Sequence, residues 1–155
     1  MKFIADVNLG KLAKWLRILG YNTVFYPENA GKAFLRKAER EGRVALTRKK
    51  AIVRGLSSGG LVIIQSDTVF DQLVEIMGKL PFIPEPDRMF SICVRCNEEL
   101  MEVDKEEVSG MVPDYIFVSH TEFRMCLHCK RVFWRGTHSE KAQHHLKMHI
   151  QSYPL

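Results

Sequence analysis

The chain has 155 residues, 46% hydrophobic and 26% charged, a composition typical of a globular protein and not of a disordered one. No stretch is long and apolar enough to span a membrane, and Asp6 follows the start too closely for a signal peptide, so we expect a cytoplasmic protein without a membrane partner. A net charge of +5 and a pI near 9.1 indicate a polyanionic partner, although surplus basic residues often only solubilise a surface.

The first half of the chain alternates short apolar strands with amphipathic helices. We expect strands at 2–7, 23–26, 44–47 and 61–64, helices at 10–19, 32–41 and 68–77, a brief helical piece at 49–54 and a turn at 57–60. The strands read as continuous apolar runs and are separated by helices. This order predicts an α/β domain whose parallel sheet is covered by helices on both faces.

Prolines mark the end of this first unit. Pro81, Pro84 and Pro86 stiffen a linker at 80–88. We therefore expect an α/β domain at 1–79 and a second, smaller unit at 89–155 that ends in a helix.

All four cysteines of the chain lie in this second unit, as two Cys-x-x-Cys pairs. Cys93 with Cys96, and Cys126 with Cys129, can bring four thiolates from two tight turns onto one tetrahedral zinc ion. The pattern predicts a structural zinc ribbon with no open coordination position. Two disulfides or four unrelated buried thiols fit less well, because adjacent Cys-x-x-Cys pairs make poor disulfide partners, and a thioredoxin-like motif would need a strand-to-helix context.

A rival ligand set combines Cys126 and Cys129 with His145 and His149, in the order of a two-Cys two-His finger. The gap from Cys129 to His145 exceeds the usual twelve residues or so, and this choice would leave the other two cysteines without a role. The simpler interpretation places these histidines, with His144, on a solvated helix face.

Acidic residues follow the predicted strands, where parallel sheets bind ligands, and converging carboxylates could hold Mg²⁺ or Mn²⁺ for phosphodiester hydrolysis. The candidates are Asp6, Glu28, Asp67 and Asp71. Asp67 could instead cap the next helix, and Glu28 could be a turn residue beside Pro27. Asp6 is the strongest candidate, because Asn8 is the better placed cap for the first helix.

Basic residues recur at helical spacing and suit a phosphate backbone. Lys11, Lys14 and Arg17 are expected to form one ridge opposite the apolar stripe of the first helix, although a solvated face explains any single lysine better. The ridge is expected to continue in Arg36, Lys37 and Arg40, with Arg43, Arg48, Lys49, Lys50 and Arg54 around the third strand. Phe133 and Trp134 alternate with Lys130, Arg131 and Arg135, and either stack on bases or build the ribbon core.

Together these residues resemble the PIN-like RNase domain family with a C-terminal zinc ribbon, the C-terminal RNase domain of Mut-seven-type proteins. The resemblance covers nearly the whole chain and rests on Asp6, on segments 9–17, 19–21, 42–43 and 46–48, on the four cysteines and on segment 133–138. It implies a PIN-like three-layer fold in which strand-end acids bind Mg²⁺ or Mn²⁺ and an activated water cleaves RNA. The RNA-binding candidates are then Lys11, Lys14, Arg17, Arg48, Lys49, Arg131, Trp134 and Arg135.

The chain departs from the family pattern at two positions. Asn22 and Lys49 stand where the family pattern has acids, and a lysine in an acid cluster would repel a cation. We expect a metal-dependent ribonuclease whose ribbon assists RNA binding. The alternative is a catalytically lapsed RNA-binding or ribosome-associated module, and a protein-binding adaptor would differ from both in showing little salt dependence.

Overall fold

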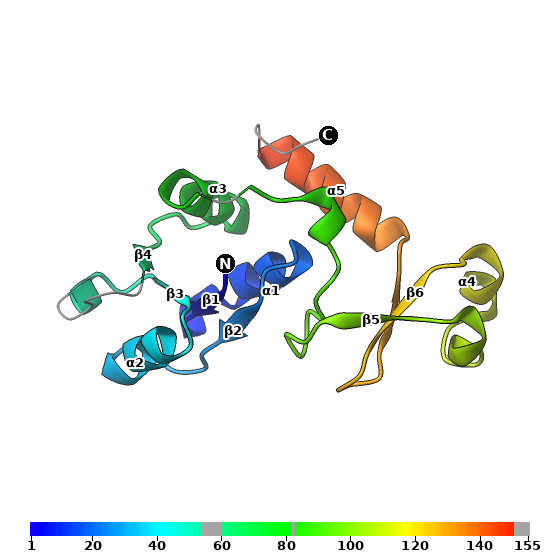
Figure 1. The fold of residues 1–155 in the computed structure, drawn as a ribbon. Coiled ribbons are helices and arrows are strands. Elements are labelled where there is room, and N and C mark those ends of the chain that lie inside the picture. The colour runs from blue at the N-terminus through cyan, green and yellow to red at the C-terminus, as the bar shows by residue number, and fades with distance from the viewer. Residues whose placement is uncertain (54–59, 82, 151–155) are drawn as a thin grey trace.

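The computed structural model describes residues 1–53, 60–81 and 83–150, and its first half is built on a parallel sheet (Figure 1). The strands are β1 (Phe3–Ala5), β2 (Thr23–Phe25), β3 (Val44–Thr47) and β4 (Leu61–Ile63), in the order β2-β1-β3-β4. All three pairings between them are parallel. The predicted α/β class and the predicted strands are confirmed, with small shifts at the ends.

Helices cover both faces of this sheet because successive side chains of a strand point to opposite sides. Phe3 and Ala5 pack with α1 (Gly10–Ile18) and α3 (Val69–Lys79), which lie on one face. Ile4 packs with α2 (Lys32–Arg40) on the other face. The result is three layers, so the basic residues of α2 cannot continue a ridge that begins on α1.

Short 3-10 turns complete the connections. They are η1 (Val7–Leu9), η2 (Lys50–Val53) and η3 (Pro86–Arg88). Arg54 and most of the turn expected at 57–60 lie outside the described residues. The linker crosses the end of α1 at Gly20, where φ is +82° and an added Cβ would lie 2.2 Å from the carbonyl oxygen of Arg88. Only glycine fits this close approach.

The second unit contains a three-stranded antiparallel sheet. Its strands are β5 (Leu100–Val103), β6 (Phe123–Cys126) and β7 (Val132–Trp134), in that order. Between β5 and β6 the chain inserts η4 (Lys105–Val108) and α4 (Asp114–Ser119), two elements that were not predicted from the sequence. Val108, Ile116 and Phe123 form a small core there, against which Trp134 packs.

The C-terminal helix α5 (Thr137–His149) returns to the first unit and packs on the α1/α3 face (Figure 1). Leu146 and Ile150 are buried in the main core, and so is Met89 from the end of the linker. The proposed domain limits therefore stay a prediction, while the core itself extends across them. Among the described helices, none has the length and apolar character needed to cross a membrane.

Candidate functional site

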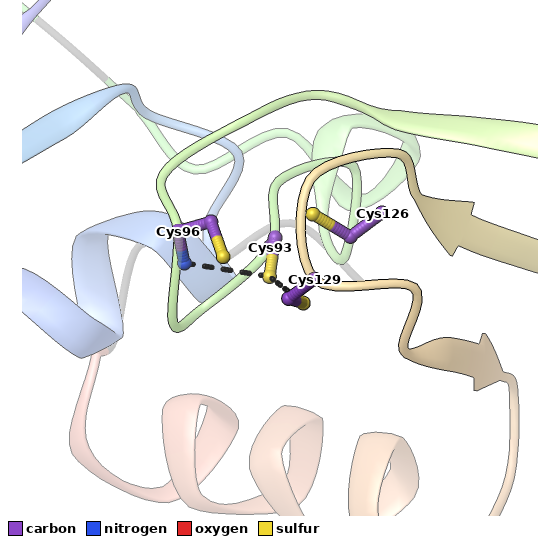
Figure 2. Close-up of side chains that lie close together, drawn as sticks. All are labelled: Cys93, Cys96, Cys126 and Cys129. Atoms are coloured by element: carbon purple, nitrogen blue, oxygen red, sulfur yellow. Dashed lines mark hydrogen bonds between the residues drawn. The ribbon is translucent and has the colours of Figure 1, made fainter.

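Four cysteine side chains from two turns converge beside α1 (Figure 2). Their sulfur atoms all lie within 4.8 Å of one another, and all four cysteines are free. The Sγ atoms of Cys93 and Cys129 are 3.8 Å apart, far beyond a disulfide bond. Four sulfur donors in one closed group are the ligand set of structural zinc, so the residues fit the predicted ion.

The two turns share one backbone geometry. In the first, the N–H of Cys93 donates to Glu98 O at 2.8 Å, and the N–H of Asn97 donates to Cys93 O at 2.8 Å. In the second, the N–H of Cys126 donates to Arg131 O at 3.0 Å and the N–H of Lys130 donates to Cys126 O at 2.8 Å. Asn97 and Lys130 both adopt positive φ, 63° and 58°. The equivalent bonds give both segments the same knuckle shape, which is compatible with a zinc site.

The thiols of the cluster differ in acidity. Burial raises the pKa of Cys93, and desolvation with the neighbouring sulfurs raises the pKa of Cys96 to about 12. The backbone N–H of Arg131 donates to the sulfur of Cys129 and lowers its pKa to about 7. Since zinc ligation requires all four thiolates, zinc affinity should fall as the pH falls.

The rival two-Cys two-His ligand set is wrong. His145 and His149 lie on α5 and stack on Phe70 of α3, with ring centroids 5.8 and 4.4 Å from that of Phe70. Neither belongs to the cysteine group, which is the only cluster of three or more metal-ligating side chains found in the described part of the chain. His144, His145 and His149 are all exposed, as the simpler interpretation of a solvated helix face predicted, and the rings of the last two lie against Phe70.

The helical spacing predicted that Arg17 lies on an exposed basic ridge, and this prediction is wrong. Its side chain is buried, at 8% exposure, and donates from Nη1 to the carbonyl oxygens of Val94 and Arg95 in the first knuckle, at 2.7 and 3.2 Å. Its Nε donates to Thr23 O at 2.9 Å. Arg17 therefore ties the first knuckle to α1 and β2, and its positive charge lies near the thiols of Cys93 and Cys96.

Asn22 adds to this connection from the start of β2. Its Nδ2 donates to Asn97 O at 3.2 Å, and its Oδ1 accepts from Asn97 Nδ2 at 3.0 Å and from Arg43 Nη1 at 2.6 Å. Asn22 precedes β2, whereas Asp6 follows β1, and these strands are parallel. Asn22 is thus at the opposite edge of the sheet from Asp6, and the expectation that it costs the acid cluster a ligand is wrong.

Asp6 directly follows β1, at the end of the sheet where the parallel strands terminate, called the carboxyl edge below. Its side chain is buried, with 1% of the residue exposed. Its Oδ1 accepts from the backbone N–H of Asn8 at 3.0 Å, and its Oδ2 accepts from the hydroxyl of Thr47 at 2.5 Å. Asp6, not Asn8, is the cap of η1, and α1 has no side-chain cap. The carboxylate of Asp6 therefore links the ends of β1 and β3, a structural role that the sequence did not reveal.

The other three acids have different surroundings. Asp67 is 88% exposed and its Oδ1 pairs with Arg48 Nη2 at 2.6 Å. Asp71 Oδ2 accepts from Thr68 Oγ1 at 2.7 Å in the first turn of α3, where Thr68 and not Asp67 is the cap. Glu28 is exposed in the loop after β2, and its backbone oxygen accepts from the N–H of Val7. No three of these acids form a metal-binding group within the described ranges.

Lys49 belongs to the same edge as Asp6. Its backbone N–H donates to Thr47 Oγ1 at 3.0 Å, and its ammonium donates to the carbonyl oxygen of Ala30 at 3.1 Å, just before α2. The hydroxyl of Thr47 thus connects the Asp6 carboxylate with the Lys49 backbone. A cation at this edge would meet the positive charges of Lys49 and Arg48.

Two grooves flank β7. One, of about 780 Å³, lies between α1 and the knuckles and is lined by Gly10, Ala13, Lys14, Arg17, Phe25, Val94, Arg95, Arg131 and Phe133. The other, of about 540 Å³, is lined by Met89, Phe90, Glu102, Val103, Asp104, Glu107, Thr121, Glu122, Phe123, Arg124, Phe133, Trp134 and Arg135. Three of the predicted RNA-binding residues line the first groove, namely Lys14, Arg17 and Arg131. Two others, Trp134 and Arg135, line the second groove together with four acidic residues.

Comparisons with known proteins agree with the resemblance seen in the sequence. The family model described as Mut7-C RNAse domain matches residues 1–146. Neither the curated proteins nor the solved structures yielded a match. Since the family model covers nearly all of the 155 residues, the chain belongs to the Mut7-C RNAse domain family.

Proposed function

We propose that this protein is an RNA-directed ribonuclease whose cleavage site is the carboxyl edge of the parallel sheet, with Asp6 at its centre. The observation that carries the proposal is a buried carboxylate, 1% exposed, at the edge where parallel sheets bind ligands, in a chain of a ribonuclease family. The three layers are compatible with the PIN-like fold, which we propose as the finer fold class.

The groups around Asp6 suit a role in proton transfer. Thr47 and the backbone of Asn8 fix the orientation of both carboxylate oxygens. A carboxylate held in this way can accept a proton from a water molecule or a ribose hydroxyl, and that oxygen then attacks phosphorus. The P–O bond to the leaving ribose oxygen breaks, and the leaving oxygen takes up a proton from solvent. Lys49 and Arg48 at the same edge supply positive charge for the phosphate.

A requirement for Mg²⁺ or Mn²⁺ stays a prediction. The acids of this edge do not fit a divalent cation in this structure, because Asp67 pairs with Arg48 and Asp71 with Thr68. We therefore derive no catalytic step through such an ion. Zinc is different, since the four cysteines fit it; a closed Cys₄ site shapes the knuckles and has no open position for chemistry.

A second candidate function is RNA binding without cleavage. Lys49 favours it, because this lysine stands where the family resemblance implies an acid, and the pairing of Asp67 with Arg48 also opposes a cation there. In this case Asp6 would only hold β1, β3 and η1 together.

Asp6→Asn separates the two candidates, because it keeps the size of the side chain and removes its charge. We expect zinc-loaded wild-type protein to cut a structured RNA. Asp6→Asn should cut the same RNA at least about 100-fold more slowly, with RNA affinity nearly unchanged. The assay compares buffers without added divalent ions, with Mg²⁺ and with Mn²⁺, and avoids chelators that would also remove zinc.

Thermal unfolding of Asp6→Asn serves as the control, since a misfolded variant would be inactive for trivial reasons. Full cleavage by a well-folded Asp6→Asn protein would contradict the proposed site. Inactivity of the wild type with retained RNA binding would favour the second candidate.

A further inference from the structure

The groove between α1 and the zinc knuckles carries positive charge on both walls. Lys14 and Arg17 contribute from α1, and Arg95 and Arg131 contribute from the first and second knuckle. None of the described residues that line it is acidic. Lys14, Arg95 and Arg131 are exposed, so their charges are available to a ligand, while the buried Arg17 adds charge at the base.

Aromatic rings accompany these cations. Phe25, at the end of β2, is 40% exposed, an unusual position for a large apolar ring. Phe133 of β7 lines the knuckle side and does not belong to the small core of the second unit, unlike Trp134. Flat apolar rings beside phosphate-binding cations are what unpaired bases require, because each base offers a face for stacking.

We propose that this groove binds single-stranded RNA, an inference that rests on the proposed function and adds the form of the substrate and its path. A volume of about 780 Å³ is in the range of sites for small ligands and suits a few nucleotides of one strand. Double-stranded RNA is read by shape across about 16 base pairs, without exposed base faces.

One end of the groove lies at the proposed cleavage site. Phe25 is paired in the sheet with Ala5, the residue before Asp6. Gly10, the first residue of α1, lies against Phe25: a Cβ there would be 3.4 Å from its ring. A strand held between Lys14 and Arg131 therefore leaves the groove at the carboxyl edge of the sheet.

The second groove of the ribbon supplies an internal contrast. Its lining includes the carboxylates of Glu102, Asp104, Glu107 and Glu122, with Arg124 already paired to Glu102 at 3.3 Å. This excess of negative charge repels a phosphate backbone. Trp134 and Arg135 lie on this side, so we expect them to contribute less to RNA binding than Arg131.

The test measures binding of a labelled oligo(U) by fluorescence anisotropy, with zinc-loaded full-length protein and no added Mg²⁺ or Mn²⁺. Lys14→Glu and Arg131→Glu should each weaken binding at least tenfold and reduce the salt slope by about one or more. Arg36→Glu, the same charge change at an exposed position of α2 on the other face of the sheet, is the matched control and should bind as the wild type does.

Further arms test the single-stranded form of the ligand. Phe25→Ala should weaken binding of oligo(U) about 5- to 100-fold, as loss of a stacked base does, and should leave the salt slope unchanged. A hairpin RNA with a fully paired stem and a minimal loop should bind at least tenfold more weakly than oligo(U) of equal length. Polyglutamate should fail to compete.

The outcomes are distinguishable. If the wild type binds RNA and Lys14→Glu and Arg131→Glu bind equally well, the groove is wrong while the proposed function survives. Equal binding of paired RNA or no effect of Phe25→Ala would overturn the single-stranded specificity, and effective competition by polyglutamate would overturn RNA as the ligand, because any polyanion would then bind. If the wild type binds no RNA, the inference and the proposed function fail together.

Discussion

The cysteine cluster and the acids at the carboxyl edge of the sheet were predicted as two metal sites, but among the described residues only the cysteines converge into one group. The cysteine sulfurs converge within 4.8 Å, and both turns are closed by equivalent backbone bonds. The acids are each engaged by a different protein group: Asp6 by Thr47, Asp67 by Arg48 and Asp71 by Thr68. The sulfurs converge on one another and accept from backbone N–H groups, an arrangement compatible with one shared cation, whereas Asp6, Asp67 and Asp71 each have a side-chain partner of their own.

Cys96→Ser should have the largest effect, because it removes one of the four sulfurs that converge in the cysteine cluster. We expect loss of the bound zinc and unfolding of both knuckles, since zinc binding contributes about 10–16 kcal/mol in isolated zinc-finger peptides. Metal analysis and thermal unfolding check this. His145→Ala is the control for the rival ligand set and should keep one zinc per chain; retention of a full zinc equivalent by Cys96→Ser would contradict the four-cysteine assignment.

This variant should also remove RNA binding by the groove. Arg95 belongs to the first knuckle and Arg131 follows the second, so one wall of the groove depends on zinc. Because Arg17 bonds to the backbone of Val94 and Arg95, its position changes as well. Oligo(U) binding by Cys96→Ser, measured beside its zinc content, should fall with it.

Local spacing explains why one site could be predicted and the other could not. Two Cys-x-x-Cys pairs define their own turns, and the sequence contains that information within four residues. Arg17 shows the opposite case: helical spacing placed it beside Lys14 on an open face, but the first knuckle covers it. Its signal existed only in the tertiary packing, and the same is true of Asn22 at the opposite edge of the sheet.

Smaller signals were present and were missed. Asp6 stands two residues before Asn8 and takes the cap of a 3-10 turn, which a search for α-helical caps overlooks. Pro113 and Asp114 precede an apolar run, a pattern that starts a helix and marks α4. The apolar strands and the periodic helices of the first unit were predictable, because burial on one or both faces dictates their composition.

Lys49→Asp tests whether the acids at the carboxyl edge of the sheet can be made to bind a divalent cation. The change removes a cation and adds a carboxylate beside Thr47 and Asp6, so we expect Mn²⁺ affinity to rise at least about tenfold. Titration of the variant with Mn²⁺ measures this, with Mg²⁺-dependent cleavage as a second readout. Lys50→Asp, an equal charge change at the exposed neighbour, is the control.

If Mn²⁺ affinity rises equally in both variants, only the general charge of the edge matters. If cleavage appears in Lys49→Asp alone, the wild type is a ribonuclease that lost one ligand. Unchanged affinity in both variants would mean that Asp6 cannot take part in a cation site.

Glu75→Gln should have the smallest effect and concerns the acid with the most protein donors near this edge. Burial alone would raise the pKa of Glu75, but Lys79 and the backbone N–H groups of Ser66 and Gln65 outweigh it and lower the pKa to about 2. Because the pKa of the folded state lies below the ordinary value of 4.5, the carboxylate stabilises the fold above pH 4.5, and this stabilisation is lost as the pH falls toward 2.

We expect Glu75→Gln to lower the free energy of unfolding by about 1–2 kcal/mol at pH 7. The difference from wild type should shrink steadily in denaturant titrations at decreasing pH, whereas zinc loss at low pH affects both proteins alike. A difference that stays constant from pH 7 to pH 3 would show that these bonds do not hold the loop before α3, and hence that the position of Asp67 has another cause.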